Sequence, residues 1–445
     1  MKKLLAASAV TLGLLGSSLS AAHASEDPAA ASEIPGQAVS RAASAAGDDV
    51  PLPEDLDESS TELDDEISQP VPETEDEAPF VMGATPGDEG SQEEGIENPD
   101  PLAGAQNPSI TCRARLLIAM RDGSEEPITC ATWDSTPSVA PLRASVSAWP
   151  TPNWCDDHGV SGKWYVNRFK ACGIFSATAS VINPRTGTVT GTLHYLVRAY
   201  AYSGRDVPNW AYQVELMEVS STGTAKGMSA SGRVKCSGKC KVTKSTFPSQ
   251  AMSQNKDAVG QFFLQTTIKT SPKGQKGDGQ ASASWVFTKA GATPSNEISL
   301  PTPPVRCDNA LPGTSKPGCV MPYIPEMVYA KAGEYPELAK HIEDAQNTQN
   351  LPGKHGTTRY LTRLTDRTKI KENRDTSCPS SLTRPPGKQC DEYPFASTWQ
   401  GAKTGGSYSR RMIAATQNEG GGRALGNFYL YNRIIEKDRF LVWIK

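Results

Sequence analysis

Residues 210–216 read WAYQVEL, an alternation of apolar and polar side chains with a period of two. This period is that of a β-strand that buries one face and exposes the other. Similar alternation occurs over residues 193–197, 261–269 and 283–288, and Gly, Pro and Asn residues separate these stretches. We therefore predict an all-β, sandwich-like domain over residues 108–300. No active-site pattern is recognisable in it.

The beginning of the chain has the features of a secretory signal peptide. Lys2 and Lys3 precede an apolar run that is too short to span a bilayer, and alanines flank His23. We expect cleavage after Ala24, so that residues 1–24 are removed and the remaining chain is secreted. No later segment is apolar enough to predict a membrane span.

Charge is segregated along the chain, although the formal net charge is only -4. Residues 25–107 hold 23 acidic residues and one basic residue, so we predict that this segment is disordered. Residues 108–445 hold 42 basic and 26 acidic residues, a balance typical of proteins that bind polyanions. The acidic segment could be a solvated spacer, or an intramolecular inhibitor that competes with nucleic acid for the basic domains.

The ten cysteines are even in number and occur as near neighbours, which favours disulfides in an oxidising compartment. The spacing of Cys236 and Cys240 is loosely metal-like. No second Cys or His pair stands at a matching distance, so disulfides are favoured over zinc. The simplest connectivity is sequential: Cys112 with Cys130, Cys155 with Cys172, Cys236 with Cys240, Cys307 with Cys319, and Cys378 with Cys390.

The last third of the chain differs in pattern from the β-rich part. A run of prolines indicates a linker over residues 301–319. Residues 320–445 mix helical and strand patterns, and we predict that they form one α+β domain. Within it, the apolar spacing predicts a helix over residues 335–346, and the apolar run 440–444 predicts a strand.

The stretch Cys390-Asp391-Glu392-Tyr393-Pro394 places two adjacent carboxylates between a cysteine and a proline. In a regular strand the two carboxylates point to opposite faces, whereas a kink could bring both to one site. Hard divalent cations prefer such oxygen ligands. From residue types alone, solvated charges beside a turn are the more common explanation.

Three stretches of the C-terminal region share an order with one known family. Residues 335–345 read YPELAKHIEDA, residues 391–398 read DEYPFAST and residues 417–426 read QNEGGGRALG. They resemble the early helix, the signature, and the Asn- and Gly-containing loop before a helix in secreted bacterial deoxyribonucleases of the NucA/NucB family. The resemblance covers nothing before residue 320. Some relatives carry an acidic residue where Gln417 stands, so this position departs from the pattern.

The resemblance implies hydrolysis of DNA phosphodiester bonds with little sequence preference, assisted by Mg²⁺ or Mn²⁺. Asp391 is the expected metal ligand, and Glu392 a second ligand or a base. His341 is a candidate base, and Asn418 is a candidate for positioning water or a ligand. His341 could equally be a surface or capping side chain, and Asn418 could only shape a Gly-rich turn.

Cations for DNA phosphates are plentiful in this region. Residues 320–445 hold 19 basic and 13 acidic residues. The guanidinium group of arginine binds phosphate through two parallel hydrogen bonds. The candidate phosphate-binding residues are Arg374, Arg384, Arg411 and Arg423.

A second hypothesis is an extracellular or cell-wall-associated binding protein with a catalytically inactive nuclease-like domain. The β-rich domain would then hold a cell-wall or inhibitor-protein partner. The intact pair of Asp391 and Glu392 favours the enzyme, because a degenerate copy is free to lose it. The ligand of the β-rich domain stays open.

Overall fold

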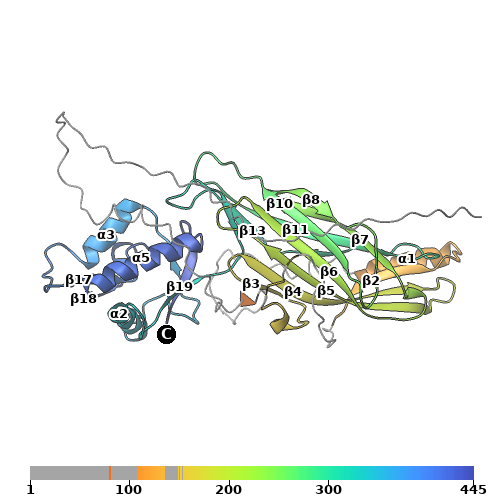
Figure 1. Cartoon of the computed structure of the whole chain (residues 1–445), viewed down its shortest axis with the longest axis horizontal. Coiled ribbons are helices and arrows are strands. Elements are labelled where there is room, and N and C mark those ends of the chain that lie inside the picture. The colour runs from red at the N-terminus through yellow and green to blue at the C-terminus, as the bar shows by residue number, and fades with distance from the viewer. Residues whose placement is uncertain (1–79, 82–107, 136–148, 150, 153) are drawn as a thin grey trace, which may run out of the picture. The chain divides into compact units, whose positions relative to one another are not determined.

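The computed structural model describes residues 80–81, 108–135, 149, 151–152 and 154–445 (Figure 1). The predicted signal peptide lies outside the described residues. The predicted disordered acidic segment does too, apart from the two-residue backbone of strand β1, Phe80–Val81. The described part of the chain is mostly β, with few helices, as predicted.

The larger sheet has eight strands within the described ranges. Their order is β1-β3-β4-β5-β6-β10-β8, and β2 also pairs with β4. The predicted strand at 210–216 lies in β6 and pairs antiparallel with β5 and β10. The bounds are β2 Ile128–Trp133, β3 Trp164–Val166, β4 Lys170–Ile182, β5 Val189–Tyr202, β6 Asn209–Ser221, β8 Cys240–Thr246 and β10 Ala258–Thr266.

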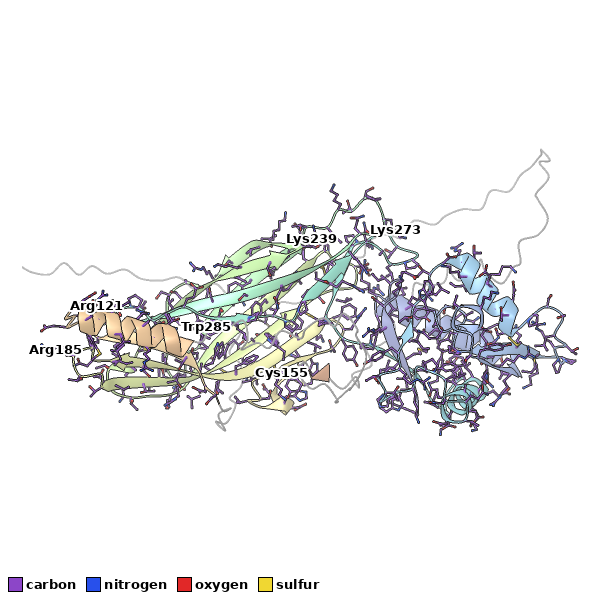
Figure 2. All side chains as sticks on the ribbon, turned by 180° about the vertical axis from the view of Figure 1, so that it is seen from behind. Arg121, Cys155, Arg185, Lys239, Lys273 and Trp285 are labelled. Carbon is purple, nitrogen blue, oxygen red and sulfur yellow. A yellow bond between two sulfur atoms is a disulfide. The ribbon has the colours of Figure 1, made fainter. Side chains whose placement is uncertain are left out.

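A second sheet of six strands packs against the first, counted over the described residues. Its order is β14-β13-β11-β7-β9, and β12 pairs with β11. The two sheets share one core, which contains Trp285 (Figure 2). The indole of Trp285 donates to the hydroxyl of Tyr195 at 3.3 Å. The bounds are β7 Ser229–Gly238, β9 Gln250–Ala251, β11 Lys276–Thr288, β12 Ile298–Pro301, β13 Val305–Asp308 and β14 Gly318–Val320.

The outer face of β6 differs from the prediction of an exposed polar face. Gln213 and Glu215 are completely buried. Tyr200 on the neighbouring strand donates to Glu215 at 2.8 Å and also bonds the backbone carbonyl of Trp149. Trp149 and Trp154 pack over this face, and the polar side chains satisfy one another there.

The β-rich region also contains a helix that the sequence pattern did not reveal. Helix α1 spans Pro108–Arg121, and the disulfide between Cys112 and Cys130 ties it to β2. Its residues favour helix, but its apolar side chains do not gather on one face, so no amphipathic period marks it. Within the described residues, none of the helices has the length and apolar character that crossing a bilayer requires.

The predicted linker over residues 301–319 is wrong, because this stretch belongs to the smaller sheet. It contains β13 and most of β14, which pair antiparallel. Pro301 is the last residue of β12, and Pro303 and Pro304 lie between β12 and β13, where no ladder hydrogen bond is needed from them. All five predicted disulfides are present, and no described cysteine is free.

The C-terminal domain, from β15 onward, has its own core. Strand β19 lies between β15, which is parallel to it, and β16, which is antiparallel, while β17 and β18 form a separate pair. The predicted helix and closing strand are confirmed as α2 and β19. The bounds are β15 Glu326–Tyr329, α2 Pro336–Asn347, β16 Leu361–Thr362, α3 Arg367–Ser377, β17 Lys388–Tyr393, α4 Ala402–Gly405, β18 Ser409–Ala414, α5 Ala415–Tyr431 and β19 Arg439–Ile444.

A cluster of buried charges joins β13 to the segment after α5. Arg433 is fully buried and contacts the carboxylate of Asp308 at 3.0 Å. Arg168 bonds Asp438 at 3.1 Å, and burial beside Arg306 lowers the pKa of Arg168 to about 10. These guanidinium groups also donate to backbone carbonyls, so the buried charges are hydrogen-bonded as well as paired.

Candidate active site

The two candidate carboxylates lie on β17, in an antiparallel hairpin with β18. Asp391 pairs in register with Arg411, and Glu392 pairs with Arg410. Because side chains alternate along a strand, Asp391 and Glu392 face opposite sides of the hairpin. The contacts agree with this alternation, since Asp391 meets helix α2 and Glu392 lies beside the end of α3. The structure therefore does not join the two carboxylates in one site.

On the first face, Asp391 is held by His341 of helix α2. The Nδ1 of His341 lies 2.5 Å from Oδ2 of Asp391, and its Nε2 lies 3.0 Å from the hydroxyl of Ser409. His341 is completely buried, and Asp391 is 6% exposed. Both ring nitrogens have protein partners, so His341 has no nitrogen free to accept a proton from a water molecule.

The environment of Asp391 makes its charged form costly. Burial raises the pKa of the Asp391 carboxyl, and the hydrogen bond and charge of His341 only partly oppose this effect. Arg411 acts weakly in the same direction as His341. Such a carboxylate gains from an added cation nearby, since a positive charge favours its ionised form.

Two further predicted residues lie on the same side of the hairpin as Asp391. The side chain of Arg411 is 38% exposed, and its guanidinium group bonds Asp344 of α2 at 2.9 Å. Asn418 of α5 donates to the side chain of Gln389 at 3.0 Å, and Gln389 alternates onto the same face of β17 as Asp391. The structure thus brings Asp391, His341, Arg411 and Asn418 to one face.

On the opposite face, Glu392 lies beside cations from α3 and β18. Burial raises the pKa of Glu392 to about 7, the charge of Asp391 adds to this effect, and Arg374 opposes it. Arg410 donates to the backbone carbonyl of Ser377 at 3.1 Å. Glu392 and Arg374 therefore form a second, separate group of charges.

The remaining predicted phosphate-binding arginines are not part of either group. The guanidinium group of Arg384 donates to backbone carbonyls of its own loop, including that of Cys378 at 3.0 Å. Arg423 is exposed on α5. Arg384 therefore organises the loop that leads into β17, and Arg423 is a solvent-facing cation.

The Gly-containing stretch is not a loop before a helix, because it lies inside helix α5. A Cβ at Gly420 would meet the ring of Tyr335, and one at Gly421 would meet Leu338. The hydroxyl of Tyr329 also donates to the carbonyl of Gly421 at 2.8 Å. These two glycines therefore let α5 approach the start of α2 closely, and they do not form a phosphate cradle.

Gln417 and Glu419 have protein partners as well. The side-chain oxygen of Gln417 accepts from the backbone amide of Glu337 at 2.7 Å, in the first turn of α2. The carboxylate of Glu419 accepts a hydrogen bond from Gln389. Gln417 thus satisfies an amide that the helix leaves without an intrahelical partner.

Sequence reasoning missed three residues that complete the Asp391 face. Asp344 follows His341 by three residues, so both lie on one side of α2, and this helical spacing was a usable signal. Ser409 occurs in no motif and reaches the site only through the pairing of β17 with β18. Gln389 shares the face of Asp391 because it stands two residues before it on β17.

The donor set at Asp391 suits only some divalent cations. Among the described residues, no group of three or more His, Cys, Asp and Glu side chains is placed to hold a metal. A closed, tetrahedral zinc site is therefore not formed there. Mg²⁺ and Mn²⁺ prefer oxygen ligands, and Mg²⁺ binds through one or two carboxylates, with water and phosphate oxygens. Asp391 fits this mode, and Asn418 supplies an amide group on the same face.

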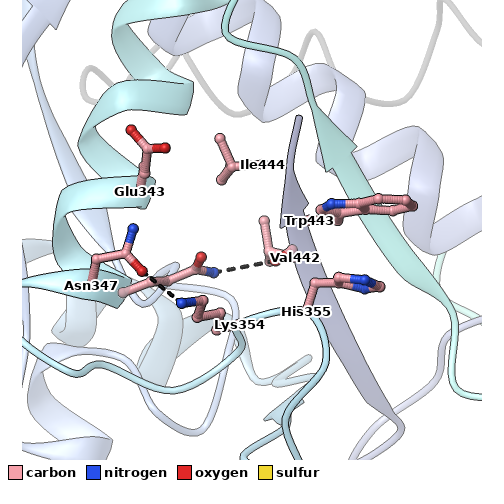
Figure 3. A pocket seen from close by; sticks show the side chains of 8 residues that line it. Glu343, Asn347, Lys354, His355, Val442, Trp443 and Ile444 are labelled. Atoms are coloured by element: carbon pink, nitrogen blue, oxygen red, sulfur yellow. Dashed lines mark hydrogen bonds between the residues drawn. The ribbon is translucent and has the colours of Figure 1, made fainter.

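A cavity of about 240 Å³ lies elsewhere in the C-terminal domain, between α2, β19 and the loop that carries His355 (Figure 3). The imidazole of His355 stacks on the indole of Trp443, with 4.2 Å between ring centroids. Glu343 and Lys354 also line the cavity, whereas none of the predicted site residues does. This cavity and the carboxylate site are therefore different places.

Comparison with known proteins indicates a family for part of the C-terminal region. No curated protein matches the chain. The family model described as deoxyribonuclease NucA/NucB matches residues 348–443. This range contains Asp391, Arg411 and Asn418, while His341 precedes it. Residues 348–443 thus form a deoxyribonuclease domain of the NucA/NucB family.

Proposed function

We propose that the chain is a secreted, divalent-cation-dependent endodeoxyribonuclease that cuts DNA phosphodiester bonds with little sequence preference. The family match at residues 348–443 supports the reaction class. The observation that carries the site is the buried Asp391 carboxylate, which is held by His341 and faced by Arg411. A costly buried carboxylate next to exposed cations is typical of functional sites.

Asp391 is the proposed cation ligand, together with water and a phosphate oxygen of DNA. When bound, Mg²⁺ or Mn²⁺ would polarise the phosphoryl group and ease departure of the leaving oxygen. The partly exposed side chain of Arg411 is suited to bind a phosphate oxygen on the same face. Asn418 has an amide group that can orient water or substrate there.

The proposed role of His341 is to position Asp391. Its residue type alone had made it a candidate base. An ionised Asp391 requires that Nδ1–H of His341 donates, and in the neutral imidazole Nε2 then accepts from the hydroxyl of Ser409. Gln349 donates to the same hydroxyl at 3.0 Å. Hydrogen bonds of this kind fix the direction of a ligating carboxylate. Glu392, on the other face, has a supporting role.

Separate observations support secretion and DNA binding. Five disulfides and the signal-like residues 1–24 favour an extracytoplasmic compartment. The site offers cations and a carboxylate but no aromatic stacking platform, which favours contact with the DNA backbone over reading of bases. The acidic segment 25–107 remains either a spacer or a competitor for the basic surface.

Cleavage of supercoiled plasmid by the purified mature chain tests the proposal. We expect nicked and then linear DNA with Mg²⁺ or Mn²⁺, and intact plasmid after excess chelator is added. Plasmid that stays supercoiled with either metal, in a protein that still binds DNA, would instead indicate a binding protein with an inactive nuclease domain.

A further inference from the structure

One part of the β-rich region is strongly basic without being part of the nuclease domain. From Lys226 to Lys276 the chain has ten basic residues and one acidic residue, Asp257, whose side chain is buried. Five exposed lysines gather where β7 ends, β8 begins and the loop leads into β11. We call them the lysine patch: Lys239, Lys241, Lys269, Lys273 and Lys276.

The backbone under the lysine patch is firmly held. Lys239 is the residue between β7 and β8, and the disulfide of Cys236 with Cys240 closes the turn around it. Its amide donates to the carbonyl of Asp278 at 2.7 Å, and its carbonyl accepts from the amide of Thr267 at 2.9 Å. The turn therefore presents the Lys239 side chain from a fixed position.

The loop that carries Lys269 and Lys273 is held in place by one buried side chain. Asn309 is 1% exposed, and its amide group donates to the carbonyls of Lys269, Thr270 and Pro272 at 2.8 to 3.1 Å. Its side-chain oxygen accepts from the amide of Gln275 at 2.6 Å. Figure 2 shows Lys239 and Lys273 on the same edge of this region, away from Arg121 and Arg185.

The lysines of this patch have no carboxylate partners within the described residues. None of the five takes part in an ion pair there, and Asp278, the exposed carboxylate nearest in the chain, forms none either. Lysines on an edge strand such as β8 can simply prevent sheets from pairing with each other. This explanation covers Lys241 but not Lys269 and Lys273, which lie in a loop.

We propose that the lysine patch binds the phosphate backbone of DNA, as a second contact surface outside the nuclease domain. Ammonium groups bind phosphates as point charges and read no sequence, which suits a nuclease with little sequence preference. The inference rests on the proposed function for its choice of DNA over other polyanions.

The place of the patch in the fold supports this choice. Lys276 pairs in register with Asp308 of β13, and Asp308 is the carboxylate that Arg433 of the C-terminal domain contacts. The patch therefore lies at the end of the sheet from which the chain enters the nuclease domain. Two surfaces on one chain that bind one DNA molecule raise the affinity above that of either alone.

Equilibrium binding to a labelled 30-base-pair duplex, across a series of salt concentrations, tests the inference. The full mature chain is used with Asp391→Asn, so that no DNA is cut. The patch variant adds Lys239→Gln, Lys269→Gln and Lys273→Gln. The control variant adds Lys226→Gln, Lys256→Gln and Lys289→Gln, which remove the same charge at the other end of β7.

We expect the patch variant to bind about tenfold more weakly near 0.1 M salt, and its slope of log Kd against log salt to fall by about 2 to 3. The control variant should stay within about twofold of its parent. Equal weakening in both variants, or in neither, would overturn the inference. Lost affinity for polyglutamate with unchanged affinity for DNA would assign the patch to an acidic segment and overturn it as well.

This binding measurement does not depend on cleavage. If the wild-type chain never cuts plasmid, the proposed nuclease function fails. The affinity difference between the two variants still shows whether the lysine patch binds DNA.

Discussion

The lysine patch of the β-rich region and the cations around the candidate active site differ in their partners. In the C-terminal domain many cations are paired with carboxylates, such as Lys388 with Glu337 at 2.7 Å and Arg411 with Asp344 at 2.9 Å. In the β-rich region the lysine patch has no such pairs among the described residues. Paired charges position groups for chemistry, whereas unpaired charges are free to attract a polyanion. We infer that chemistry and much of the binding are divided between the two regions.

The largest expected effect is a difference in cleavage rate between substitutions on the two faces of β17. Asp391→Asn should lower the rate of plasmid cleavage by about 100-fold or more, because it removes the proposed ligand charge while keeping an oxygen for His341. Glu392→Gln should lower it by less than about tenfold. Cleavage rates at saturating Mg²⁺ provide the comparison. Equally severe effects would mean that both carboxylates serve one site.

Loss of the disulfide that precedes Asp391 should destabilise the C-terminal domain. Replacing Cys378 and Cys390 by serine should lower the free energy of unfolding by about 3 kcal/mol, on the chain-entropy estimate for a loop of this length. The same change at Cys236 and Cys240, which close a shorter loop, should cost about 2 kcal/mol. Urea denaturation of each variant measures the difference. A larger loss at the shorter loop would contradict this account of the disulfides.

Substitutions of His341 distinguish positioning from proton transfer. His341→Ala leaves buried partners unsatisfied, so the free energy of unfolding should fall by about 1–3 kcal/mol, and cleavage should slow. His341→Asn retains a group that can donate to Asp391 and should recover part of the activity. Asparagine cannot act as a base, so equal inactivity of two folded variants would speak for proton transfer by His341.

The smallest expected effects are changes in stability at two neighbouring glycines of α5, Gly421 and Gly422, which serve as a matched pair of substitution sites. Gly421→Ala would place a Cβ against Leu338, so we expect a loss of about 1–3 kcal/mol of stability from overpacking. Gly422 is exposed, with nothing within 4 Å of its added Cβ, so Gly422→Ala should stabilise the helix by about 0.5–1 kcal/mol. Thermal unfolding of both variants decides whether the glycines serve helix packing.

Local patterns in the sequence predicted much of the fold correctly. The period of two at 210–216 gave β6, and the apolar spacing at 335–346 gave α2. Helix α1 was missed because its apolar residues show no preferred face. The prediction of a linker over residues 301–319 was wrong for two reasons. Prolines are compatible with the short connection between β12 and β13. The pairing of β13 with β14 depends on contacts that local sequence does not encode.

The sequence predicted which residues belong to the candidate site better than it predicted how those residues are arranged. Asp391 and His341 were chosen from the motif, and they do form a pair. Their partner Ser409 was not predicted, because it arrives through the register of β18. The glycines of α5 were taken for a loop, since nothing local shows that Tyr335 and Leu338 pack against them.

The maximal rate of single-turnover plasmid cleavage, with protein in excess over its Kd for DNA, tests the division of labour most directly. The account predicts that the chain with Lys239→Gln, Lys269→Gln and Lys273→Gln cuts at the wild-type maximal rate once DNA is saturated. It predicts that the Asp391→Asn chain binds DNA but cuts at least about 100-fold more slowly. A normal rate for Asp391→Asn, together with a reduced maximal rate for the lysine variant, would contradict it.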